Sequence, residues 1–158
     1  MRFRGLQLNV NRLGMPGMET MFEWGRRASD RATSAPAAPV KDLLLECAIA
    51  QEQIEVLYQP LIQPGTGRIV GAEALSRSSI VPSAEALFAR ATAARLDERL
   101  SRLVQRKALR CASVWEGPLK SLKVSLNLLP QDLARDNYAQ WLLDEIESAG
   151  IDPKRVTV

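Results

Sequence analysis

The chain of 158 residues contains no histidine. This absence excludes Ser-His and Cys-His nucleophilic catalysis, and any histidine-ligated metal site, from the side chains of this chain alone. A metal bound here needs oxygen ligands, which points to Mg²⁺, Mn²⁺ or Ca²⁺. Cysteine occurs only at Cys47 and Cys111, both within apolar helical patterns. We expect buried free thiols in a reducing compartment rather than a disulfide or a redox site.

Long apolar runs are also absent. No stretch approaches the roughly 18 apolar residues that a helix needs to cross a bilayer. The N-terminus is basic but lacks the apolar core of a secretory signal. We therefore expect a cytoplasmic protein without a transmembrane segment. No GxGxxG sequence follows a strand, so a Rossmann-type nucleotide site is not expected.

Charge is distributed unevenly along the chain. Residues 1–40 hold six arginines and three acidic residues, which account for the whole net charge of +3. This segment ends in a Pro-, Ala- and Ser-rich stretch, so we predict a flexible, mildly basic tail or linker. Residues 41–158 carry 15 basic and 15 acidic residues, without a basic stripe interleaved with aromatics. This composition argues against binding to a nucleic-acid polymer.

Strand and helix patterns alternate from Lys41 onward. Periodicity predicts strands at 54–62, 69–74 and 122–127, the opening of a fourth at 155–158, and helices at 41–52, 83–94, 96–114 and 138–148. The turn at Pro64–Gly67 joins the first two strands as an antiparallel hairpin. This order is typical of an α/β fold, and a (β/α)8 barrel fits it best. Such a barrel needs about 200–250 residues, so we predict a partial barrel, truncated at about the fourth strand.

The tripeptide Glu-Ala-Leu occurs twice in different contexts. Glu73 follows an apolar run and is predicted to end a strand, whereas Glu85 stands at a helix start. Asn127 ends the next strand, and barrel active sites lie at the carboxyl ends of strands. A carboxylate and an amide oxygen there could share one hard divalent cation. Arg77 could hold a phosphate, and Gln59 could hydrogen-bond a base edge or a water.

Simpler interpretations remain open for these residues. A strand-end carboxylate such as Glu73 is more often solvated or part of a cap than a metal ligand. Asn127 could cap the short helix that Pro130 opens, which is a common role for asparagine. Arg77 could pair with any nearby acidic residue.

Four motifs together resemble one known family. Tyr58-Gln59-Pro60-Leu61 and Thr66-Gly67-Arg68-Ile69-Val70-Gly71-Ala72-Glu73-Ala74-Leu75-Ser76-Arg77 closely resemble the opening of the EAL-domain phosphodiesterases of bacterial cyclic di-GMP signalling. Val124-Ser125-Leu126-Asn127-Leu128-Leu129 is similar to the asparagine motif of the third strand in that family. The segment 150–158 resembles the entry into strand four. The resemblance covers about residues 41–158, in the same order.

The resemblance implies roles for the candidate residues. Glu73 and Asn127 would be metal ligands, and Gln59 and Arg77 would contact cyclic di-GMP. In the family, a (β/α)8-type barrel holds two Mg²⁺ or Mn²⁺ ions, which activate a water that opens cyclic di-GMP to linear pGpG. Family members often dimerise, which implies a homodimer or a partner protein here.

Departures from the family pattern limit this expectation. The next metal-binding glutamate would follow strand four, and the chain stops at Val158. The later paired aspartates, the lysine and the general-base glutamate have no counterpart, so we expect no catalytic residue within this chain and no hydrolase activity from it as written. The alternative is a non-catalytic module that binds a partner or cyclic di-GMP. Half a barrel leaves an open strand edge, which favours association.

Overall fold

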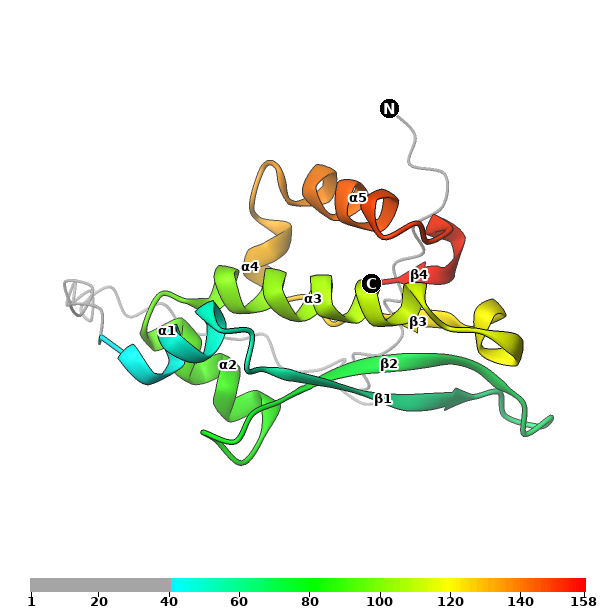
Figure 1. Cartoon of the computed structure of the whole chain (residues 1–158), viewed down its shortest axis with the longest axis horizontal. Coiled ribbons are helices and arrows are strands. Elements are labelled where there is room, and N and C mark those ends of the chain that lie inside the picture. Colours follow the sequence, from blue (N-terminus) through cyan, green and yellow to red (C-terminus); the bar gives the residue numbers. More distant parts are fainter. Residues whose placement is uncertain (1–40) are drawn as a thin grey trace, which may run out of the picture.

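Four strands form one mixed sheet in residues 41–158, the part of the chain that the computed structural model describes (Figure 1). Across the sheet they lie in the order β1 (Glu55–Ile62), β2 (Ile69–Arg77), β3 (Lys123–Ser125) and β4 (Val156–Thr157). β1 is antiparallel to β2, and the pairs β2–β3 and β3–β4 are parallel. The predicted α/β class with an antiparallel first strand is confirmed. The tail or linker predicted for residues 1–40 lies outside the described residues.

The β1–β2 hairpin is longer than predicted. Its turn uses Gly65 and Gly67 at φ values of +87° and +66°, which glycine adopts without steric cost. Pairing runs from Ile62 opposite Ile69 to Glu55 opposite Arg77, so β2 extends three residues past the predicted end at residue 74. The polar Ser76 and Arg77 belong to the strand because β1 supplies backbone partners for them.

Helices surround the sheet on one side and at one end. They are α1 (Leu43–Ala50), α2 (Ala84–Ala93), α3 (Asp97–Ser113), α4 (Pro130–Leu133) and α5 (Tyr138–Ser148), with 3₁₀ turns η2 (Gly117–Ser121) and η3 (Pro153–Arg155). α1 and α2 begin at side-chain caps, where Asp42 and Ser83 accept hydrogen bonds from Leu45 N (3.0 Å) and Ala86 N (3.1 Å). No helix of residues 41–158 is long and apolar enough to cross a membrane.

The main core lies between the sheet, α3 and α5. Figure 1 shows both helices on the same side of β1 and β2. Side chains of the sheet meet side chains of the two helices there; the buried members include Ala74, Val124, Leu126, Val156, Ala108, Leu109, Ala112, Leu142 and Ile146. A second buried cluster joins α1, α2 and the first half of α3. α3 contributes to both clusters and therefore holds the two parts of the structure together.

Two predictions about side-chain burial are wrong. Cys47 and Cys111 are exposed rather than buried. In α1 the buried face is formed by Leu45, Ala48 and Ile49, which recur at three- and four-residue intervals, and Cys47 lies on another face. In α3 the buried stripe passes through Ala108 and Ala112, and Cys111 lies beside it.

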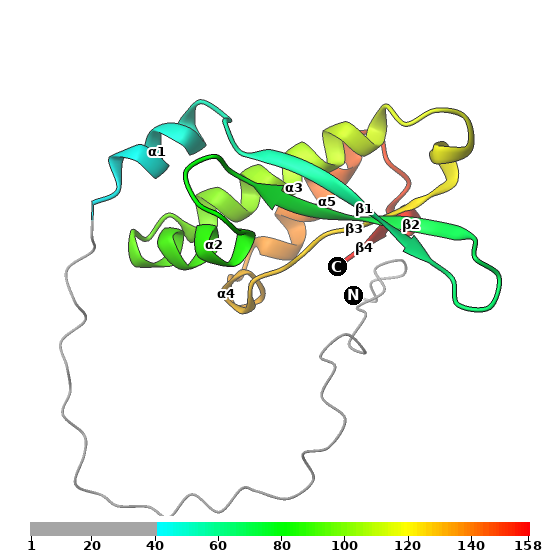
Figure 2. The same ribbon diagram turned by 90° about the horizontal axis from the view of Figure 1, so that it is seen from below.

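The two faces of the sheet differ in exposure. On β2, Ala72, Ala74 and Ser76 point toward the helices and are buried. The alternate residues point the other way. We call this second face the open face; it is defined by Leu57, Gln59, Glu73, Leu75, Arg77, Lys123, Ser125 and Thr157. Figure 2 views the same strands and helices from below. Leu57 on the open face is 51% exposed, so this face is far less covered than the helix side.

Candidate functional site

One row of polar side chains crosses all four strands of the open face. Gln59 is paired with Glu73 across the antiparallel ladder, Glu73 with Ser125, and Ser125 with Thr157 across the parallel ladders. Directly paired residues project from the same face of a sheet. The row therefore places an amide, a carboxylate and two hydroxyl groups side by side.

The sequence predicted that Glu73 ends its strand, but the structure shows that the strand continues beyond it. It lies in the interior of β2, which continues to Arg77. It is nevertheless the last residue of β2 that pairs with β3, because that ladder runs only from Gly71–Lys123 to Glu73–Ser125. Glu73 thus marks the carboxyl end of the parallel part of the sheet, and its side chain is half-buried.

Asn127 is brought to Glu73 from 54 residues further along the chain. It lies two residues beyond β3, and its Nδ2 donates to Glu73 Oε1 at 3.2 Å and to the Ala74 carbonyl oxygen at 3.3 Å. Both partners are acceptors, which identifies this end of the carboxamide as the nitrogen. The Oδ1 atom is the other end, where it can accept a hydrogen bond or bind a cation. The cap of α4 is at Leu129, so Asn127 does not serve as that helix cap.

Gln59 and Arg77 have different relations to this pair. Gln59 is exposed and directly opposite Glu73. Arg77 is on the same face but four residues along β2, a displacement of roughly 13 Å in an extended strand. Its Nη1 donates to the Ser76 carbonyl oxygen at 2.8 Å, and its ladder partner is Glu55. The structure therefore brings together Gln59, Glu73 and Asn127 but not Arg77.

The described residues offer a limited set of metal ligands. No group of three or more Cys, Asp or Glu side chains within residues 41–158 is arranged to hold a metal ion. Glu73 and Asn127 provide a carboxylate and a carboxamide oxygen, the ligand types that Mg²⁺ and Mn²⁺ prefer. The donor set fits a hard divalent cation, and other ligand positions need water or further groups.

A buried polar network behind Asn127 was missed from the sequence. Tyr138 Oη donates to Gln105 Oε1 (2.8 Å), Gln105 Nε2 donates to Ser101 Oγ (3.0 Å), and Ser101 Oγ donates to Asp132 Oδ2 (2.6 Å). Burial raises the pKa of the Tyr138 hydroxyl, which stays protonated and can donate. The sequence signal was available, because Ser101 and Gln105 interrupt the apolar stripe of α3 at a four-residue interval.

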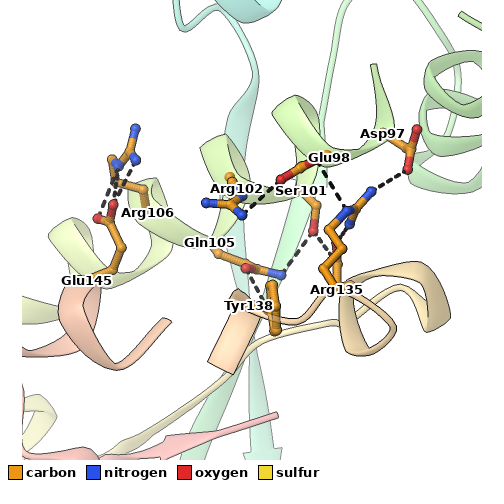
Figure 3. Close-up of polar contacts among 10 residues, drawn as sticks. Asp97, Glu98, Ser101, Arg102, Gln105, Arg106, Arg135, Tyr138 and Glu145 are labelled. Carbon is orange, nitrogen blue, oxygen red and sulfur yellow. Dashed lines mark hydrogen bonds and ion pairs between the residues drawn. The ribbon is translucent and has the colours of Figure 1, made fainter. Parts of the chain in front are cut away.

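Charged residues surround this network. Arg135 contacts Asp132 and also pairs with Asp97 and Glu98, at 3.0 and 3.3 Å. Figure 3 shows Tyr138, Gln105 and Ser101 in succession, with Arg135 near one end. Asp132 is fully buried, and its carboxylate oxygens accept hydrogen bonds from this arginine, from Ser101 and from Leu129 N.

Comparisons with known proteins give one consistent family. Residues 44–158 match the model of the EAL domain. The sequence is 30% identical over 120 residues to the probable cyclic di-GMP phosphodiesterase PdeB of Escherichia coli (strain K12); the match covers 72% of this chain and 23% of PdeB. The chain thus spans less than a quarter of that relative.

Solved structures resemble the fold. The PaMucR phosphodiesterase in complex with c-di-GMP superimposes with a TM-score of 0.64 at 20% identity, covering 71% of this chain and 47% of that chain. Klebsiella pneumoniae BlrP1 with manganese and cyclic diGMP superimposes with a TM-score of 0.54 at 26% identity, and the match covers 77% of this chain and 27% of that chain. A calcium complex of BlrP1 superimposes with a TM-score of 0.55 at 29% identity, and the match covers 65% of this chain and 26% of that chain. The likeness confirms the predicted fold, part of a (β/α)8-type barrel.

Proposed function

The chain belongs to the EAL domain family, and from this membership we propose that Glu73 and Asn127 bind a divalent cation in a site for cyclic di-GMP. The observation that carries the proposal is the 3.2 Å contact between the two side chains. Two oxygen-bearing groups from distant parts of the sequence meet on the open face, at the carboxyl end of the parallel strands. Relatives are described as cyclic di-GMP phosphodiesterases, and BlrP1 was solved with manganese or calcium.

The residues of the site have distinct parts in this proposal. Glu73 supplies negative charge, and Asn127 supplies Oδ1 while its Nδ2 remains hydrogen-bonded to the strand. Gln59, directly opposite Glu73, donates to or accepts from a guanine edge or an ordered water. Arg77, on the same face but farther along β2, would hold a phosphate at a distance from the cation. A bound Mg²⁺ or Mn²⁺ would polarise a phosphate oxygen and lower the pKa of a bound water.

The reaction to which such a site contributes is hydrolysis of cyclic di-GMP to pGpG. Mg²⁺ needs about six oxygen ligands in an octahedral arrangement. Among residues 41–158, Glu73 and Asn127 supply two of them, and the other positions need water or further groups, so we infer that the polypeptide of residues 1–158 binds the ion weakly. We also infer that it does not turn over substrate by itself.

A titration with Mn²⁺ tests the cation site. Mn²⁺ is paramagnetic and broadens the NMR signals of nearby nuclei, so we expect selective broadening at Asn127 and Ser125 in the ¹⁵N-labelled chain. The Glu73→Ala variant should need at least about tenfold more Mn²⁺ for half-maximal broadening. Loss of a residue that supports a metal ligand typically lowers metal affinity by this factor, and loss of a ligand itself should lower it at least as much. The matched control is Glu85→Ala, which removes the exposed glutamate of the other Glu-Ala-Leu copy in α2. Equal titrations of the two variants would contradict the proposal.

A non-catalytic interaction module is the second candidate. The observation that favours it is apolar exposure on the open face and beside it, where Leu57 is 51% and Ile69 53% exposed. Apolar surface of this kind often marks contact with another protein or a second copy. The same titration discriminates the two functions, because an interaction module without a cation site gives no selective broadening at Asn127.

A further inference from the structure

The loop that carries Asn127 is held from the helix side of the sheet. The Asn127 side chain lies on the open face, but its backbone carbonyl accepts a hydrogen bond from Gln105 Nε2 at 3.3 Å. Gln105 belongs to α3 and is 1% exposed. One residue of the loop is thus contacted from both sides of the sheet.

The rest of the loop backbone is also fixed by named partners. Leu126 N donates to the Thr157 carbonyl oxygen at 2.8 Å, in line with β4. Leu129 N donates to Asp132 Oδ2 at 3.1 Å. Both ends of the segment 126–129 are therefore restrained, one by the neighbouring strand and the other by the carboxylate to which Ser101 also donates.

The direction of the hydrogen bonds leaves Gln105 little freedom. Its Oε1 accepts from Tyr138, and its two Nε2 hydrogens are donated to Ser101 and Asn127. A flipped amide would set its oxygen against the carbonyl oxygen of Asn127, two acceptors without a hydrogen between them, so the orientation is determined. Satisfied networks in a low-dielectric interior are rigid, and a half-satisfied one is costly.

Stability alone does not explain a glutamine at this place. Residue 105 lies in an otherwise largely apolar stripe between the sheet and α5, where a leucine would bury more apolar surface. Replacing a whole hydrogen-bonded set with apolar groups of the same shape can be nearly neutral, whereas removing Gln105 alone leaves its partners without it. The hydrogen bonds of Gln105 offset its desolvation, and one of them ends on the backbone of the Asn127 loop.

We propose that Gln105 is a positioning residue for Asn127. By fixing the carbonyl of Asn127, it sets the backbone orientation from which the side chain reaches Glu73 Oε1 and directs Oδ1 away from the strand. Ser101, Asp132 and Tyr138 hold Gln105 and the far end of the loop. This inference rests on the proposed function, because the orientation of Oδ1 matters for a cation shared with Glu73. Metal and binding sites work only when their ligand atoms lie well within 1 Å of the required positions.

The first test needs no metal. In the ¹⁵N-labelled chain, Gln105→Leu should shift the Asn127 side-chain amide signals toward those of an unrestrained asparagine. The matched control is Tyr58→Phe, which removes a partly buried hydrogen bond to the same helix, from Tyr58 Oη to the Ala108 carbonyl oxygen at 2.7 Å. The control should also lower thermal stability, but it should leave the Asn127 signals in place. Unchanged Asn127 signals in Gln105→Leu would overturn the proposal.

The second test adds Mn²⁺. Gln105→Leu should need about tenfold more Mn²⁺ for half-maximal broadening at Asn127, as expected for loss of a supporting residue. Tyr58→Phe should titrate like the unmodified chain, and an unchanged titration of Gln105→Leu would count against positioning. If the unmodified chain shows no selective broadening while Gln105→Leu still shifts the Asn127 signals, the proposed cation site fails and the hold on Asn127 stands.

A milder variant covers the case in which Gln105→Leu does not fold. Tyr138→Phe keeps the ring packing and removes only the hydroxyl that donates to Gln105 Oε1. It should shift the Asn127 side-chain signals in the same direction by a smaller amount. An Asn127 signal identical to that of the unmodified chain would then refute the relay from Tyr138 through Gln105.

Discussion

Gly71 is a point of close approach between β2 and β3. A Cβ atom added there would lie 2.8 Å from the Lys123 carbonyl oxygen and 3.2 Å from Lys123 Cβ. Gly71 and Lys123 are ladder partners, and each is two residues before a member of the polar row, Glu73 and Ser125. The present spacing of the strands that carry the candidate ligands therefore leaves no room for a side chain at residue 71.

Gly71→Ala should push these strands apart. We expect a loss of about 1–3 kcal/mol in the free energy of unfolding, the usual cost of overpacking, measured by urea denaturation. The Asn127 side-chain amide signals should shift as well, since their partners are on β2.

Gly65→Ala is the control for this change. Its φ of +87° disfavours alanine, but nothing lies within 4 Å of an added Cβ. It should cost about 1 kcal/mol without moving the Asn127 signals. If both variants leave Asn127 unaffected, Gly71 does not control the spacing of the site.

At the scale of residues, the sequence predicted the strand or helix to which a residue belongs better than the side chains around it. Context alone separated Glu73 from Glu85, since an apolar run predicts a strand and a polar stretch with a serine cap predicts a helix start. The contact between Glu73 and Asn127 follows from adjacent parallel strands. Gln105 was missed because periodicity counts only apolar positions and says nothing about a polar residue within the stripe.

At the scale of elements, α3 connects the parts of the structure. Lys107 Nζ donates to the Glu52 and Ile54 carbonyl oxygens, each at 2.7 Å, where the chain passes from α1 into β1. Tyr58 of β1 donates to the Ala108 carbonyl oxygen. Arg106 pairs with Glu145 of α5 through both carboxylate oxygens, the closest at 2.7 Å (Figure 3). One helix thus fixes the position of β1, the Asn127 loop and α5.

The Arg106–Glu145 pair makes the docking of α5 depend on pH. Hydrogen bonds from Arg106 lower the pKa of Glu145 below its usual value of 4.5. A carboxyl group with a lowered pKa contributes stability above its unfolded-state pKa, and the contribution is lost as pH falls through the folded-state value. We expect Glu145→Gln to cost about 1 kcal/mol at pH 7 and to flatten the decline in stability below about pH 4.5.

Urea denaturation at several pH values measures this effect. Glu147→Gln is the control, because it changes an exposed glutamate of the same helix. Asp42, whose pKa is likewise lowered by Arg90, should retain part of the pH dependence in both variants. Identical pH dependence in the two variants would show that the pair does not stabilise the docking of α5.

The bounds of a helix were predictable where its apolar residues lie on a single face. α5 spans Tyr138–Ser148, the range that its periodicity predicts. The buried face of α1 was not predictable, because Leu43, Leu44 and Leu45 are consecutive and the pattern does not choose among them. The structure buries Leu45 and leaves Leu43 and Leu44 more than half exposed. Tertiary packing against α2 and α3 makes the choice.

At the scale of the whole molecule, the order of strands follows from connectivity. Crossover helices between parallel strands place β2, β3 and β4 side by side, and a short turn makes β1 antiparallel. These features could be predicted from the sequence. The register could not, because it depends on close contacts such as Gly71 with Lys123.

We expect no sustained pGpG production when the polypeptide of residues 1–158 is incubated with cyclic di-GMP and Mg²⁺ or Mn²⁺. The described residues bring two candidate oxygen ligands to the open face, and about six are needed around Mg²⁺. Chromatographic detection of pGpG over time measures the outcome. Turnover that Glu73→Ala abolishes and Glu85→Ala preserves would show instead that these residues suffice for catalysis.

The alternation of faces along β3 limits how this chain can change in length. Val124 and Leu126 point into the core, and Ser125 and Asn127 point to the open face. An insertion or deletion of a single residue between Val124 and Asn127 would exchange the two faces and carry the carboxamide into the core. We therefore expect length changes to be tolerated in turns such as the one at 64–67. Between Val124 and Asn127 the number of residues must stay the same, so that each side chain keeps its face of the sheet.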